Sequence, residues 1–165
     1  MQLIFKLLVL ALVVCTPVKA EPAPPVLQAK LAFTIEANLA PMLELGDSAD
    51  GKRINIPITG GRVFGDKING KVLPGGADYQ LIHADGTVVL HAVYMLQTDD
   101  GAVINVVNDG VLVPPKNGSA LYFRTSPRFN APNGRYTWLN NSIFVAGIRE
   151  SNKDNSVLID VYRLE

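Results

Sequence analysis

The segment Thr87–Gln97 (TVVLHAVYMLQ) decides the fold class. It contains neither glycine nor proline, and its β-branched and aromatic residues are typical of a strand. Ala84-Asp85-Gly86 precedes it and Asp99-Asp100-Gly101 follows it. Because Asp-Gly accepts the positive φ of a tight turn, both sites predict hairpins, with Tyr79–His83 before the first and Ala102–Val107 after the second. The segment is therefore one of three predicted antiparallel strands.

The remainder of the chain also consists of short β-like runs between turn residues. Only Ala37–Leu45 shows any helical spacing, and Pro41 interrupts it, so we expect no helix beyond a turn near Pro41–Leu45. A strand at the end of the chain favours closure against an earlier strand. We therefore predict an all-β fold, a single antiparallel β-barrel of about eight to ten strands. The further predicted strands are Leu31–Ala37, Arg53–Ile58, Ala120–Ser126, Tyr136–Trp138, Ser142–Arg149 and Val157–Leu164.

The first twenty residues have the pattern of an export signal. Lys6 precedes the apolar run Leu7–Cys15, which is too short to span a bilayer, and Val18-Lys19-Ala20 offers a cleavage site. Lipid attachment at Cys15 is the alternative. We expect residues 1–20 to be a signal peptide, 21–30 a proline-rich leader and 31–165 the barrel domain, located in the periplasm or secreted.

Cleavage changes the composition of the chain. It removes two of the 15 basic residues, and the remaining 13 face 15 acidic residues, a net charge of −2. A net negative charge argues against a nucleic-acid partner. Cleavage also removes the single cysteine, which excludes disulfides and thiolate chemistry. We expect no stable membrane insertion after cleavage, and the oligomeric state stays open.

Several phrases in the middle of the chain occur together in one known family. They are Pro57–Val63 (PITGGRV), Gly70–Asp78 (GKVLPGGAD), Thr98–Gly101 (TDDG), Tyr122–Thr125 (YFRT) and Tyr136–Asn140 (YTWLN). In order and spacing the chain resembles domain of unknown function family 3237, over roughly Leu31 to Glu165. The resemblance implies a compact antiparallel β-barrel, and it implies no settled chemistry.

Three motifs suggest chemistry that the rest of the sequence does not support. Gly46-Asp47-Ser48 resembles a lipase nucleophile block, but no histidine follows His91 to activate the serine. An EF-hand starting at Asp47 would need a glutamate where Ile58 stands, which argues against calcium. No helix follows the glycine pairs at 60–61 and 75–76, so they indicate bulges or barrel corners rather than phosphate loops.

The two histidines, His83 and His91, lie on either side of the Asp85-Gly86 turn. They are either an acid–base pair, two metal ligands, or ordinary strand residues. Without a third ligand, two histidines make a weak zinc site. We therefore predict no metal and no cofactor.

Strand alternation predicts the candidate ligand site. Asp78, Tyr94, Asn105 and Arg124 are polar groups that share strand faces with apolar neighbours, as in an apolar pocket with few polar groups. Alternatively, Asp78 and Arg124 form a structural ion pair, and Tyr94 and Asn105 satisfy backbone groups. Trp138, with Tyr136 and Phe144, either lines the same site as an aromatic wall or belongs to the core.

Two functions remain open at this stage, besides a structural barrel without a ligand. The first is a carrier that binds a small, largely apolar or aromatic molecule in the barrel. The second is a cofactor-independent isomerase, cyclase or lyase. In that case Asp78 is the candidate catalytic base, and Tyr94 or Arg124 stabilises an oxyanion.

Overall fold

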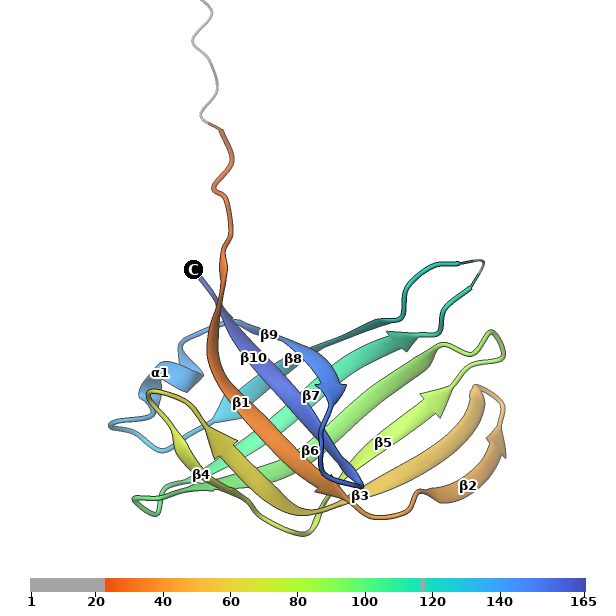
Figure 1. The fold of residues 1–165 in the computed structure, drawn as a ribbon, viewed down its shortest axis with the longest axis horizontal. Helices are drawn as coiled ribbons and strands as arrows, with labels where there is room; N and C mark the ends of the chain where they lie inside the picture. Colours follow the sequence, from red (N-terminus) through yellow and green to blue (C-terminus); the bar gives the residue numbers. More distant parts are fainter. Residues whose placement is uncertain (1–22, 117) are drawn as a thin grey trace, which may run out of the picture.

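The computed structural model describes residues 23–116 and 118–165, which form ten strands and one short helix (Figure 1). In chain order these are β1 (Ala29–Leu39), β2 (Leu43–Ser48), β3 (Gly51–Phe64), β4 (Asn69–Val72), β5 (Gly76–Ile82), β6 (Val88–Thr98), β7 (Val103–Val113), β8 (Tyr122–Asn130), α1 (Thr137–Asn140), β9 (Phe144–Glu150) and β10 (Ser156–Leu164). Both predicted Asp-Gly turns are present, with positive φ at Gly86 and Gly101.

Eight of the strands close into a barrel, which confirms the predicted fold class. Around the barrel the order is β1, β10, β9, β8, β7, β6, β5 and β3, and β3 pairs with β1 again. Every pairing is antiparallel. The final strand therefore has partners on both sides, and closure removes the two edges that an open sheet would leave.

The strand β3 connects the barrel to the two additional strands. Its first half pairs with β2 and β5, and its second half pairs with β1 and β4. The change of partners occurs around Gly60-Gly61, where a Cβ at Gly61 would lie 1.9 Å from the Glu36 carbonyl oxygen. A side chain does not fit there, so the glycine pair forms a barrel corner, one of the two structures that its sequence indicated.

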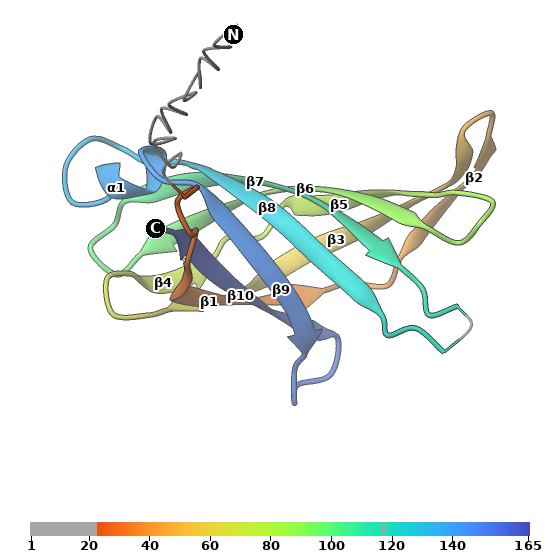
Figure 2. The same cartoon turned by 90° about the horizontal axis from the view of Figure 1, so that it is seen from above.

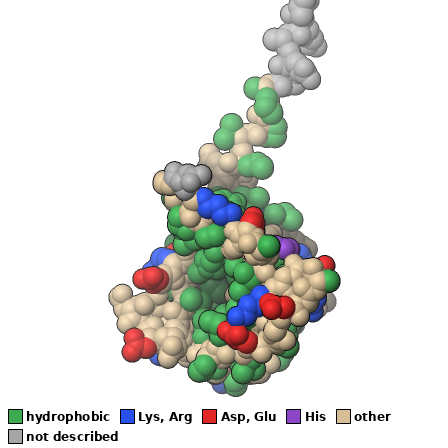
Figure 3. All heavy atoms as spheres, turned by 90° about the vertical axis from the view of Figure 1, so that its right-hand side faces the viewer, with side chains coloured by type: hydrophobic (Ala, Val, Ile, Leu, Met, Phe, Trp, Pro, Cys, Tyr) green, Lys and Arg blue, Asp and Glu red, His purple; other side chains and the backbone are tan. Residues whose placement is uncertain are grey.

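The two ends of the barrel differ. At one end α1 lies beside a packed core that includes the rings of Phe33, Phe129, Phe144 and Trp138, with Phe129 and Phe144 centroids 5.1 Å apart. At the other end the hairpin β2–β3, the β5–β6 turn and the β7–β8 loop project away from the barrel (Figure 2). From that side the molecule is hollowed, and hydrophobic side chains line the hollow (Figure 3).

Two sequence-based expectations about secondary structure are wrong, and the strands β2 and β4 were not predicted. Tyr136–Trp138 is not a strand: Tyr136 is the N-cap of α1 and Trp138 lies in that helix. The Asn140 side chain bonds both the N–H and the carbonyl of Ala131, which closes the loop that contains the helix. No turn forms across Pro41–Leu45, since Leu43–Ser48 pairs with β3 as the strand β2. The strand β4 was not predicted, because four residues are too few to show an alternation pattern, and only its pairing with β3 and β6 identifies it as a strand.

The expected signal peptide, residues 1–20, lies outside the described residues. From Ala23 to Gln28 the leader is exposed and has no regular structure, and β1 begins at Ala29, inside the expected leader. Within 23–116 and 118–165, no helix is long and apolar enough to cross a membrane.

Candidate functional site

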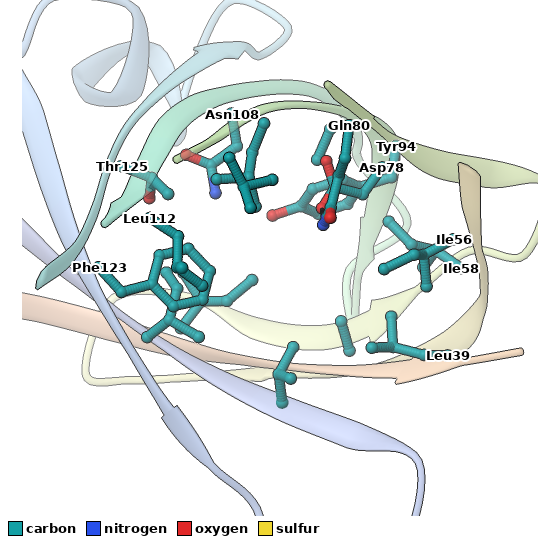
Figure 4. A pocket seen from close by; sticks show the side chains of 17 residues that line it. Leu39, Ile56, Ile58, Asp78, Gln80, Tyr94, Asn108, Leu112, Phe123 and Thr125 are labelled. Atoms are coloured by element: carbon teal, nitrogen blue, oxygen red, sulfur yellow. Dashed lines mark hydrogen bonds between the residues drawn. The ribbon is translucent and has the colours of Figure 1, made fainter. Parts of the chain in front are cut away.

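The open half of the barrel contains a cavity of about 220 Å³. All eight barrel strands contribute to its lining (Figure 4). It is smaller than the roughly 300–1,000 Å³ typical of drug-sized ligand sites. The apolar lining residues are Ala37, Leu39, Ile56, Ile58, Val88, Leu90, Ala92, Leu112, Phe123, Ile148, Val157 and Ile159.

The polar lining residues all lie on one side of the cavity. They come from four neighbouring strands, β5 to β8, whereas β1, β3, β9 and β10 contribute only apolar side chains. In Figure 4 Leu39 lies across the cavity from Asn108, whereas Ile56 and Ile58 lie beside Asp78, since Ile56 is the cross-strand neighbour of Asp78. The cavity therefore has an apolar wall and a wall with hydrogen-bonding groups. The five polar lining residues are Asp78, Gln80, Tyr94, Asn108 and Thr125.

Asp78 is the one charged residue among those described that line the cavity. Burial raises the pKa of its carboxyl above the ordinary value, while the Gln80 side chain and the nearby His91 act in the opposite direction. Gln80 Nε2 donates to Asp78 Oδ2 at 2.6 Å. The second carboxyl oxygen, Oδ1, is buried and has no partner within the described part of the chain.

Three further polar atoms of the cavity wall have no protein partner among residues 23–116 and 118–165. They are Tyr94 Oη, Asn108 Oδ1 and Thr125 Oγ1. Their residues are only 2%, 4% and 6% exposed. Burial, together with the nearby Asp78 carboxyl, raises the pKa of the Tyr94 phenol, so the phenol stays protonated and able to donate. Unpaired buried polar groups are costly and rare in proteins, and the concentration of four such atoms in residues of one cavity wall makes this cavity the candidate functional site.

The structure brings together two of the five predicted site residues. Asp78 and Tyr94 both line the cavity. Asn105 does not, because the inner face of β7 is formed by Ile104, Val106 and Asn108, and Asn105 is exposed on the outer face. The expectation that it faces the cavity is wrong by one residue of strand register, which moves a side chain to the opposite face.

Arg124 also lies on the outer surface. Its guanidinium is exposed and donates to the Phe123 carbonyl, while Phe123 and Thr125 point inward. The predicted pairing of Asp78 with Arg124 is therefore wrong, as is the expectation that Arg124 shares the cavity.

Trp138 lies in α1 at the closed end of the barrel. Its ring packs against Phe33 and Phe144, and Lys67 Nζ lies 5.9 Å from its ring centroid. It is not among the residues that line the cavity. Of the two interpretations of the aromatic cluster, the structure favours the core.

The histidines take no part in the cavity lining. His91 is on the outer wall, where its Nδ1 lies 2.6 Å from Asp109 Oδ1 and Arg128 lies 2.7 Å from the other oxygen. His83 belongs to the β5–β6 turn, where its backbone pairs with Thr87 and Gly86. Within the described residues, no group of three or more His, Cys, Asp and Glu side chains could hold a metal ion.

Sequence reasoning did not assign Gln80, Asn108 or Thr125 to the site, although Gln80 shares a strand face with Asp78. For Thr125 a signal exists, because Arg124 and Arg128 are two charged residues on one face of β8, which assigns Phe123, Thr125 and Phe129 to the other face. For Asn108 the alternation is weak, since β7 (VINVVNDGVLV) carries valine on both faces. Only its pairing with β6 fixes its direction.

The fold and the cavity define a class: a small closed antiparallel β-barrel with an internal, mainly apolar cavity that has one polar wall. The chain belongs to the family described as "Protein of unknown function (DUF3237)", whose model matches residues 27–164. The family assignment made from the sequence phrases is thus confirmed.

Two bacterial comparisons carry the family's name and its fold. A UPF0311 protein of Rhodopseudomonas palustris strain TIE-1 is 37% identical over 152 residues, which cover 85% of this chain and 98% of the relative. The crystal structure of a conserved protein of unknown function from Rhodopseudomonas palustris matches with a TM-score of 0.78 at 38% identity, covering 86% of this chain and 100% of that one.

A fungal relative has a named activity. A hydroalkoxylation enzyme of Penicillium herquei is 33% identical over 134 residues, which cover 80% of each chain. A crystal structure of an enzyme from Penicillium herquei matches with a TM-score of 0.67 at 26% identity, covering 90% of this chain and 100% of that one.

Proposed function

We propose that the protein binds a small, largely apolar molecule inside the open half of its barrel. One observation carries the proposal: four buried polar atoms without partners in the described part of the chain belong to residues that line one apolar cavity. A protein that needed only a stable barrel would gain by filling this wall with apolar side chains, since an unpaired buried polar group costs about 1–3 kcal/mol. A ligand that pairs these atoms compensates that cost.

The binding experiment uses 2-naphthol, a neutral probe with an apolar body and one hydroxyl. Titration calorimetry should give saturable binding to the wild-type protein. Leu112 lines the cavity near the end of β7, so Leu112→Trp should abolish binding. Val111 precedes it on β7 and shares the outer face with Asp109, so Val111→Trp introduces the same ring outside the cavity and should bind normally. Equal binding by both variants would place the probe elsewhere and refute the proposal.

A second candidate function is cofactor-independent acid–base catalysis at Asp78. Two observations favour it: the carboxyl has a raised pKa inside an apolar cavity, and the fungal relative is named as a hydroalkoxylation enzyme. A raised pKa makes a carboxylate a better general base near neutral pH. Hydroalkoxylation adds the O–H of an alcohol across a C=C bond. Asp78 would take the hydroxyl proton as the C–O bond forms, and the proton would then go to the other alkene carbon.

The catalytic candidate is tested with a hydroxy enone that closes to a tetrahydrofuran, followed by the loss of enone absorbance. The wild-type protein should accelerate closure, and Asp78→Asn should abolish the acceleration while retaining 2-naphthol binding. An unchanged rate in Asp78→Asn would exclude Asp78 as the base, and a rate equal to that in buffer would exclude this activity.

We also infer that the protein is exported. The support is the pattern of residues 1–20, a basic residue, an apolar run and small residues before Glu21. A carrier of apolar molecules in the periplasm or outside the cell fits this location.

A further inference from the structure

The cavity residues with unpaired polar groups form a belt across four neighbouring strands, β5 to β8. Asp78 of β5 and Asn108 of β7 both lie opposite Ala92 of the intervening strand β6, so the three residues form one row across the sheet. Neighbouring strands are about 4.8 Å apart, which places the ends of this row about 10 Å apart. Tyr94 is two residues along β6 from Ala92, diagonal to both ends of the row. Thr125 of β8 is diagonal to Asn108.

Small residues on the inner face of the barrel leave the space that the Tyr94 and Thr125 side chains occupy. A Cβ at Gly76 would lie 2.5 Å from Tyr94 Cβ, and a Cβ at Gly110 would lie 2.3 Å from Thr125 Cγ2. Neither position accepts a side chain without moving Tyr94 or Thr125. Between them Ala92 contributes only a methyl group to the cavity wall. The belt thus consists of two stations, Asp78 with Tyr94 and Asn108 with Thr125, separated by a shallow apolar surface (Figure 4).

The charges of the wall restrict the ligand. No Lys, Arg or His is among the described residues that line the cavity, and Asp78 is the single acid. A carboxylate or phosphate would therefore lose its hydration without gaining a cation, and it would lie near the Asp78 carboxyl.

A cationic ligand also fits poorly. An ammonium group has three hydrogens to satisfy. At the first station Gln80 already occupies Asp78 Oδ2, so among the described residues only Asp78 Oδ1 and Tyr94 Oη remain as acceptors without a partner, and both are buried among apolar side chains. A neutral hydroxyl or carbonyl oxygen needs only the one or two bonds that each station offers.

We propose that the ligand is an uncharged molecule with a flat apolar body and two oxygen groups, one at the Asp78–Tyr94 station and one at the Asn108–Thr125 station. This inference rests on the proposed function, because it specifies what occupies the same cavity. The apolar body faces the wall formed by β1, β3 and β10, and the oxygens face the belt. Neutral diols, hydroxy ketones and dihydroxy aromatics belong to this class, and fatty acids, phosphate esters and amines do not.

A matched series of naphthalenes tests the class by titration calorimetry at neutral pH. The series contains 2-naphthol, 2,6-dihydroxynaphthalene, 2-naphthoate and the ammonium form of 2-naphthylmethylamine. We expect the diol to bind about tenfold tighter than 2-naphthol, the value of one buried hydrogen bond. We expect the anion and the cation to bind at least tenfold more weakly than 2-naphthol. A charged compound that binds as tightly as 2-naphthol would overturn the inference.

A pair of variants assigns the second oxygen to its station. Asn108→Leu removes the inner polar group and should cancel the tenfold advantage of the diol, with little change in 2-naphthol affinity. Asn105→Leu makes the same change on the outer face of the same strand and should leave the advantage intact. A diol advantage that survives in Asn108→Leu would refute the second station.

The outcomes separate this inference from the proposed function. If none of the four compounds binds, the cavity is not a ligand site and the proposed function fails. If they bind with equal affinity and Leu112→Trp still abolishes binding, the cavity is a ligand site and only the inferred ligand class fails.

Discussion

Replacing Tyr94 with phenylalanine separates a binding group from a structural one. The ring is buried in the core cluster, and its hydroxyl has no hydrogen-bond partner in the part of the chain that the structure describes. Removing a buried hydroxyl that is hydrogen-bonded costs about 1–3 kcal/mol, because its partner is left unsatisfied. Tyr94→Phe leaves no protein group of the described residues without a partner. We therefore expect the free energy of unfolding to change by no more than about 0.5 kcal/mol downward, or to rise by up to about 1 kcal/mol.

Tyr136→Phe is the matched control. Tyr136 is also buried, 5% exposed, but its hydroxyl donates to Asp100 Oδ1 at 2.9 Å. Its replacement leaves Asp100 without that donor, so Tm should fall by several degrees.

Urea titration of the two variants and the wild type compares their free energies of unfolding. The comparison requires that the free energy depends on urea concentration with the same slope in all three proteins. The same Tyr94→Phe protein should bind 2-naphthol about tenfold more weakly, since the phenol offers a hydrogen bond only to the ligand. If Tyr94→Phe lowers the free energy of unfolding by more than about 1 kcal/mol, as much as Tyr136→Phe does, the claim that the Tyr94 hydroxyl serves only the ligand is refuted. The hydroxyl would then be a structural group.

Three further predictions concern other parts of the chain. Burial raises the pKa of Asp78 in the folded protein. Between the usual carboxyl pKa and this raised pKa, the native state therefore binds more protons than the unfolded state, and the free energy of unfolding falls as pH rises through this range. The amide introduced by Asp78→Asn does not titrate, so the free energy of unfolding of this variant should not fall in this range. In urea titrations at several pH values, the variant should exceed the wild type by on the order of 0.5–1 kcal/mol at neutral pH, and by less at acid pH. An advantage that shrinks with rising pH would contradict the assignment. Gly61→Ala should lower the free energy of unfolding by more than about 3 kcal/mol in urea titration, because its Cβ meets a backbone oxygen. Gly46 also has a positive φ but has open space around it, so Gly46→Ala should lower the free energy of unfolding by about 1–2 kcal/mol. Equal losses in the two variants would argue against a barrel corner at Gly61. The intact mass of the exported protein should correspond to a chain that starts at Glu21, and a lipid on Cys15 would contradict it.

The sequence was informative about the fold because turn chemistry is local. Asp85-Gly86 and Asp100-Gly101 mark two turns with positive φ at the glycine, and the segment between them forms β6 as one strand. The extra strand β2 and the helix α1 were not predictable in this way. All of β2 is exposed, so no burial pattern marks it, and α1 depends on the bond between Asn140 and Ala131.

The candidate site was predictable from alternation on β5, β6 and β8, and not on β7. Around Tyr94 the inner residues Leu90, Ala92 and Leu96 are apolar and His91 and Met95 are exposed, so alternation gives the correct face. On β7 the exposed residue Val103 is as apolar as the buried residue Val106, so the pattern gave Asn105 in place of Asn108. On β8 the alternation was assigned to the wrong face: Arg124 was expected to point inward, whereas Phe123 and Thr125 do. The alternative interpretation, an ion pair between Asp78 and Arg124, is wrong as well. Instead Asp78 has a raised pKa and a neutral partner, Gln80.

The central claim, that a neutral apolar molecule occupies the barrel cavity, is tested most directly by the position of bound 2-naphthol. Intermolecular nuclear Overhauser effects between its ring protons and protein methyl groups report contacts directly. We predict contacts with the inward methyl groups of Ile58, Leu90 and Ile159, which line the cavity. Contacts confined to the exposed methyl groups of Val103 and Ile143 would contradict the account, because these residues lie on the outer surface.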